Sequence, residues 1–132
     1  MSSGTPRRRD HGSISGFVVI LTVAVLACAG LVVDGARVVG AKVEAADHAE
    51  NAARSGAQEI VARDGAIVLD ISRSRRAATA YLTANGVDGV VTVTPLRITV
   101  TVRTTVHMTL LTLAGVSTKS VTATRSSEPV TR

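Results

Sequence analysis

Hydrophobic and polar positions are distributed unevenly along the 132 residues of the chain. Residues 14–33 contain no charged side chain, and as a helix rising 1.5 Å per residue they would span about 30 Å, the thickness of the hydrocarbon core of a bilayer. A helix also satisfies its backbone hydrogen bonds internally, which a lipid environment requires. The pattern therefore predicts a transmembrane helix over residues 13–33, preceded by a basic leader over residues 1–12.

Small apolar residues recur with helical spacing after the apolar segment. They predict an alanine-rich stalk helix over residues 34–64 that continues the transmembrane helix and stops at the Asp-Gly pair 64–65. An alanine face lets another backbone approach closely, so it suits packing against partner helices and equally suits packing against a sheet of the same chain. The predicted packing face consists of Ala45, Ala49, Ala52, Gly56 and Ile60.

The remaining pattern predicts a small head over residues 65–125. Residues 72–85 have helical spacing, with Ser72 or Ser74 as the expected N-cap. After Gly89 the apolar period becomes two, which predicts three antiparallel strands. The leucines of segment 107–116, between the last two strands, would either cover the sheet or reach the membrane. With a tail over residues 126–132, the expected fold class is α+β: a long membrane-spanning helix, a short helix and a small three-stranded sheet.

Charge gives the predicted membrane helix an orientation. The net charge is +5 and the isoelectric point is about 10.7, and three arginines at positions 7–9 directly precede the apolar segment. Basic residues flank the cytoplasmic side of membrane helices, so the N-terminus is expected in the cytoplasm and the head outside. Nucleic acid is not an expected partner, because aromatic residues make up only 2% of the chain and offer no stacking platform.

The single cysteine, Cys28, leaves the processing of the chain open. The helix can be retained as an anchor, residues 27–29 can be cleaved as a signal sequence, or Cys28 can be lipidated as in a lipoprotein. The last two would give a secreted or lipid-tethered small binding domain. The helical pattern continues without interruption past residue 29, which favours retention of the anchor.

Residues able to carry chemistry are few. Three histidines, at positions 11, 48 and 107, lack the spacing of a metal site, and no phosphate-binding loop or nucleophile motif occurs. We therefore expect no enzyme activity, no cofactor, no metal and no small-molecule substrate. Asp34 and Arg37, at i and i+3 just beyond the apolar segment, are expected to form an ion pair at the lipid interface.

Three stretches, at residues 8–13, 31–37 and 45–58, carry a family resemblance. In order they give a basic leader ending in Gly, a Val-Asp-x-x-Arg motif after the apolar segment, and an alanine-rich helix. The chain resembles TadE/TadG-like proteins, pseudopilin-like components of the tight-adherence (Flp-type) pilus, a type IV-like system. The resemblance implies a bacterial membrane protein that packs with other pilin-like subunits and inner-membrane pilus assembly proteins.

The resemblance also implies cleavage by a prepilin peptidase between Gly12 and Ser13. Pilin precursors commonly carry a glutamate at the fifth mature position, where this chain has Phe17. An acid in lipid is costly unless it is paired, and its absence suits a minor component that anchors or primes assembly. The chain is expected to be a short member of the family, without the large C-terminal domain of TadG-type proteins.

Overall fold

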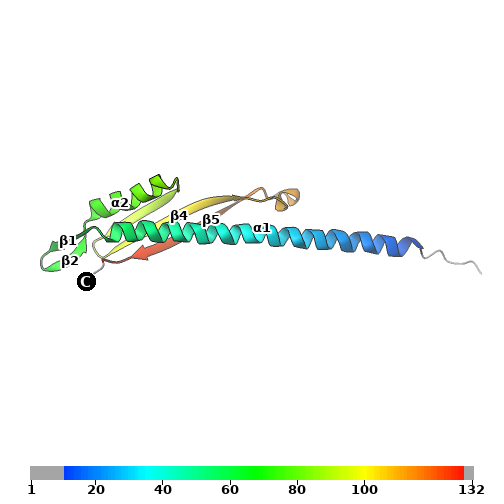
Figure 1. The fold of residues 1–132 in the computed structure, drawn as a ribbon, viewed down its shortest axis with the longest axis horizontal. Helices are drawn as coiled ribbons and strands as arrows, with labels where there is room; N and C mark the ends of the chain where they lie inside the picture. Colours follow the sequence, from blue (N-terminus) through cyan, green and yellow to red (C-terminus); the bar gives the residue numbers. More distant parts are fainter. Residues whose placement is uncertain (1–10, 130–132) are drawn as a thin grey trace, which may run out of the picture.

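The computed structural model describes residues 11–129 and shows a long helix with a small head folded along one half of it (Figure 1). The first element is the helix α1 (His11–Ala57). The N-terminal half of α1 projects away from the head. The other elements follow in the order β1 (Ile60–Arg63), β2 (Ala66–Leu69), α2 (Ile71–Ala84), β3 (Gly89–Thr94), β4 (Arg97–His107), the 3-10 helix η1 (Leu111–Ala114) and β5 (Thr118–Ser127).

Helix α1 is continuous from the apolar segment into the head, as the sequence predicts. It contains 47 residues, which corresponds to about 70 Å. Within residues 11–129 it is the helix that is long and apolar enough to cross a membrane. The large apolar side chains of its N-terminal part, from Ile14 to Val33, are exposed, the arrangement expected of a segment that faces lipid.

The predicted end of the stalk helix at Asp64 is wrong. Helix α1 ends at Ala57, and the chain then forms the antiparallel hairpin β1–β2. Asp64 and Gly65 are the two loop residues of this hairpin, with φ of 51° and 78°. A two-residue Asp-Gly loop with positive φ at both positions matches the right-handed twist of paired strands. The pair therefore turns a hairpin instead of ending a helix.

The main sheet has the strand order β3-β4-β5 and is antiparallel throughout, as predicted. Ile98, Val100 and Val102 on one face of β4 are fully buried, and β4 and β5 run alongside α1. The opposite face carries hydroxyl pairs, such as Thr101 with Thr124 at 2.9 Å. This alternation is typical of an antiparallel sheet with one buried face and one solvated face.

Strand β5 is longer than predicted. It runs to Ser127, which pairs with Ile98, so residues 126 and 127 belong to the sheet and not to a tail. Beyond the strand, Glu128 accepts a hydrogen bond from Arg97 at 2.8 Å. The expected start of the tail at residue 126 is therefore too early.

Helix α2 is capped by a residue that the sequence pattern did not single out. The Asp70 carboxylate accepts hydrogen bonds from the backbone N–H groups of Ser72 and Arg73, both at 3.1 Å. The N–H of Arg73, the hydroxyl and N–H of Ser72 and the charge of Arg73 hold the pKa of Asp70 below its ordinary value, and burial opposes them. The expected cap at Ser72 or Ser74 is wrong, since Ser74 is buried and donates to the Glu59 carbonyl at 3.3 Å.

Small side chains allow α1 to lie close to the rest of the head. Gly56 is the tightest point, because a Cβ atom there would collide with Ile98 and lie 2.8 Å from the carbonyl oxygen of Ser74. Ala49, Ala52 and Ala53 in the preceding turns have no exposed surface. The core is therefore a narrow layer in which the helix backbone itself approaches the sheet and α2.

Candidate functional site

Asp34 forms the contact between the membrane-proximal part of the head and α1. It lies one residue beyond the apolar segment and is completely buried. Its Oδ1 accepts a hydrogen bond from the backbone N–H of Thr109 at 3.1 Å, and its Oδ2 accepts from Leu110 and Leu111, both at 2.9 Å. The carboxylate thus caps the first turn of η1, as a helix N-cap does, although it lies about 75 positions earlier in the sequence.

These backbone contacts set the ionisation of Asp34. The N–H groups of Leu111 and Thr109 hold its pKa below the ordinary value, the N–H of Leu110 and the charge of Arg37 act in the same direction, and burial opposes them. Hydrogen bonds to a carboxylate favour its charged form. Asp34 is therefore a carboxylate at neutral pH, and its charge is satisfied within the protein.

Arg37 plays a smaller part in this contact than the sequence suggests. Its Nη1 lies 3.9 Å from the Asp34 Oδ1 and donates a hydrogen bond to the Thr109 hydroxyl, while about half of its side chain stays exposed. The structure brings the predicted pair together, but the backbone N–H groups of the turn are the nearer partners of the carboxylate. The side-chain pattern could not predict these partners, because every residue except proline carries a backbone N–H group.

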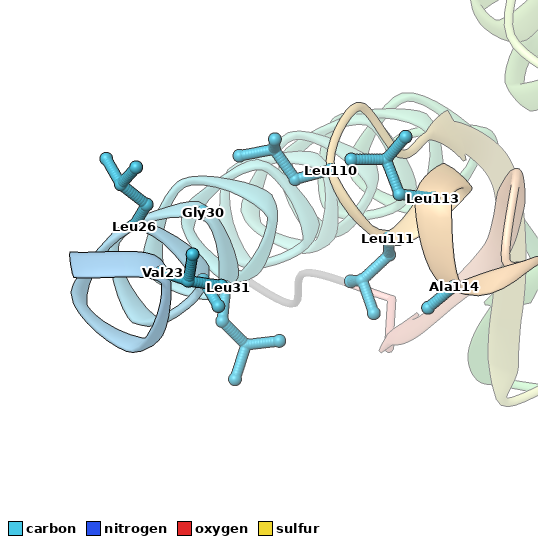
Figure 2. Close-up of a pocket in the computed structure, with 9 residues that line it drawn as sticks. Val23, Leu26, Gly30, Leu31, Leu110, Leu111, Leu113 and Ala114 are labelled. Carbon is cyan, nitrogen blue, oxygen red and sulfur yellow. The ribbon is translucent and has the colours of Figure 1, made fainter. Parts of the chain in front are cut away.

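The segment that Asp34 caps is here called the leucine turn, residues 108–116. It contacts α1 at Gly30, where a Cβ atom would collide with the Leu110 side chain. Between the turn and the helix lies an apolar groove of about 480 Å³. Figure 2 shows Leu110, Leu111 and Leu113 of the turn beside the apolar segment of α1. The lining residues are Val23, Leu26, Ala27, Gly30, Leu31, Leu110, Leu111, Leu113 and Ala114.

A second surface, here called the valine stripe, consists of Val32, Val39 and Val43. Their exposed fractions are 71%, 63% and 56%, and their spacing of seven and four residues places them on one face of α1. Gly35 and Gly40 are also exposed, and the space around both is open. An uncharged surface therefore continues from the apolar segment along the part of α1 that also carries the head.

The same region of the chain is similar in sequence to a known protein family. Residues 12–59 match the family model described as "Putative Flp pilus-assembly TadE/G-like". We call residues 12–59 the TadE/G-like segment, after the family model that they match. The match covers nearly all of α1, including Gly30, Asp34 and Arg37. No curated protein and no solved structure matches the chain.

This match confirms the family resemblance that the sequence motifs indicate. Together with a helix able to cross a membrane, it supports a role in pilus assembly and a membrane-anchored protein. The matched residues end where the hairpin begins, so the hairpin, α2 and the sheet lie outside the match.

The predicted packing face of the TadE/G-like segment is occupied by the head of the same chain. Ala45, Ala49, Ala52 and Gly56 are all buried, on the side of α1 that contacts α2, β4 and β5. Ile60 does not belong to this face, because it lies in β1 and is 43% exposed. Of the two uses that the alanine pattern allows, the structure shows packing against the chain's own elements.

The predicted processing site lies at the start of the TadE/G-like segment. The backbone of Gly12 and Ser13 belongs to the first turn of α1, and Phe17 is exposed one turn later. The arginines at positions 7–9 lie outside the described residues. Within residues 11–129 no group of three or more His, Cys, Asp or Glu side chains is arranged to hold a metal ion.

Proposed function

We propose that the protein is a membrane-anchored, minor pilin-like component of a tight-adherence (Flp-type) pilus or a related secretion system, and that it acts by packing its long helix against partner subunits. The observation that carries this proposal is the valine stripe, an apolar surface of α1 that the head leaves uncovered. The match of residues 12–59 to the TadE/G-like family supports it.

The valine stripe has the properties of a helix-packing surface. Contiguous exposed apolar surface on a protein commonly marks an interaction site. Gly35 and Gly40 beside the valines carry no side chain and have open space around them, so a partner backbone can approach closely, as small residues allow between helices. The partners proposed are other pilin-like subunits and inner-membrane assembly proteins, and no enzymatic step is assigned to the chain.

The proposed topology follows from charge and helix continuity. The basic residues at positions 7–9 stay in the cytoplasm, α1 crosses the bacterial cell membrane, and the head lies outside. Phe17 occupies the position where pilin precursors commonly carry a glutamate, so the chain lacks an acid there that could pair with a neighbouring subunit of a filament. This substitution favours a component that anchors or primes assembly over the repeating subunit of the filament.

Processing between Gly12 and Ser13 is part of the proposal. The alternative, cleavage or lipidation near Cys28, would remove Val23 and Leu26 from the groove that the leucine turn forms with α1. Intact-mass analysis of the protein from its native membrane is expected to give Ser13 as the first residue. A diacylated Cys28, or a start at residue 30, would contradict retention of the helix.

The partner surface is tested by site-specific photo-crosslinking in the native host. A photoreactive amino acid at Val39 is expected to crosslink to another pilin-like or assembly protein, because this side chain points away from the head and is 63% exposed. The matched control is Asn51, which is exposed on the same helix but outside the stripe. Equal crosslinking from both positions, or none from Val39, would contradict the proposed packing surface.

A further inference from the structure

We infer that the leucine turn is inserted into the outer leaflet of the membrane, so that lipid acyl chains fill the groove between the turn and α1. The head would then contact the bilayer at a second place, beside the transmembrane helix. This inference rests on the membrane anchoring in the proposed function, and it assigns to the head a lipid-binding surface of its own.

The position of the turn along α1 sets its depth. If hydrocarbon ends near Val33, Gly30 lies about 4.5 Å inside it and Val23 about 15 Å inside, at 1.5 Å per residue. Leu110 contacts α1 at Gly30, and the groove extends along the helix to Val23 (Figure 2). Because five of the nine lining residues belong to the apolar segment of α1, lipid that surrounds this segment also reaches the groove.

The side chains of the turn suit a lipid environment. Leu113 is 88% exposed, and Leu110 and Val116 are each exposed by more than two fifths. No charged residue occurs between His107 and Lys119. The Thr112 hydroxyl donates to the Met108 carbonyl at 2.6 Å, so this polar side chain is satisfied within the turn. Exposed apolar side chains grouped in this way are costly in water and stable in hydrocarbon.

The backbone of the turn is also prepared for lipid, where each unpaired polar group is costly. At least seven of the nine N–H groups from Met108 to Val116 donate to acceptors within the protein. Three of them bond to the Asp34 carboxylate, and four more bond to carbonyl oxygens of the turn and of Ser117. Asp34 therefore accepts the hydrogen bonds of three donors that would otherwise need water.

A basic residue beside this contact, Arg37, lies at the level of the lipid headgroups. Arg37 is four residues beyond Val33, about 6 Å further along the helix, and half of its side chain is exposed. A long basic side chain at this height can direct its charge to the lipid phosphates. The leucines lie at the level of the hydrocarbon and the arginine at the level of the headgroups. This order matches the polarity of a lipid leaflet, which favours lipid over a protein partner in the groove.

The experiment measures the depth of single labels in proteoliposomes of phosphatidylcholine and phosphatidylglycerol. Full-length protein with Cys28→Ala receives one cysteine at Leu113, at Leu26 or at Thr122, each labelled with the fluorophore NBD. Leu113 and Thr122 are both exposed, but Thr122 lies on the polar face of β5. Doxyl groups on lipid acyl chains at a shallow or a deep carbon quench labels at the corresponding depth.

The label at Leu113 is expected to be quenched at least two-fold more than the label at Thr122, and more by shallow than by deep doxyl lipid. Quenching at Leu113 no greater than at Thr122, with Leu26 quenched, would overturn the inference while leaving the membrane anchor intact. A blue-shifted but unquenched Leu113 label that depends on protein density would assign the groove to a second copy and also overturn it. Loss of quenching at Leu26 would instead contradict the membrane anchoring on which the proposed function rests.

Discussion

The head contacts α1 at two ends that are built differently. At the end far from the membrane, Gly56 and the alanines before it let the helix pack directly on the sheet and on α2. At the membrane end, one carboxylate, Asp34, holds a turn through three backbone hydrogen bonds. The first contact excludes water by close packing and the second satisfies polar groups at the lipid boundary, so the first should determine stability and the second the placement of the leucine turn.

The largest expected effect comes from filling the tight packing site. Gly56→Val places atoms against a backbone carbonyl that cannot easily move, and we expect a loss of about 3 kcal/mol in the free energy of unfolding, the upper end of the range for overpacking. Circular dichroism of the full-length protein during urea unfolding in detergent micelles measures this change. The control is Gly40→Val, at a helix position with open space around it, and an equal loss there would contradict the explanation.

A smaller and more local effect is expected at the membrane end. Asp34→Ala leaves the N–H groups of Thr109, Leu110 and Leu111 without their acceptor. We expect hydrogen exchange of these amides to become roughly ten-fold faster, while exchange in the centre of β4 stays unchanged. Arg37→Gln serves as the matched variant and should change exchange much less, because its ion pair is long and partly exposed. Equal acceleration by both variants would show that the ion pair holds the turn.

The smallest effect is that of pH. Because the pKa of Asp34 is lowered in the folded protein, its contribution is complete above the unfolded value of about 3.9 and is lost as pH falls through the lower folded value. Exchange protection of residues 109–111 relative to the Asp34→Asn variant should therefore stay constant from pH 7 to about pH 5 and decrease only in stronger acid. A decrease near pH 6 would contradict this assignment.

Local patterns predicted most of the fold. The uncharged segment 14–33 predicted the exposed part of α1, and the period of two after Gly89 predicted all three strands of the main sheet. The hairpin β1–β2 was missed because Asp64-Gly65 was interpreted as a helix stop, although the same pair is a strong hairpin signal. The β-branched residues around it, such as Ile60 and Val61, were the signal that could have identified the strands.

The candidate site was less accessible from sequence, for two physical reasons. Asp34 bonds to backbone groups more than 70 positions away, and such partners depend on the tertiary fold. The sequence placed Ala45 and Ala49 on a packing face without naming its partner, because a smooth surface of small residues fits a sheet as well as a helix. Only the folded chain shows that this face is filled and that Val39 and Val43, on another face, are uncovered.

The uninterrupted course of α1 has a mechanical consequence. The helix passes from the apolar segment to Ala57 without a break, and residues 34–57 form an arm of about 36 Å. A tilt of about 20°, common for membrane helices, would swing the far end of this arm sideways by about 12 Å. Any neighbour that reorients the helix inside the bilayer therefore displaces the outer tip of the molecule by about the width of a helix, with the protein acting as a lever.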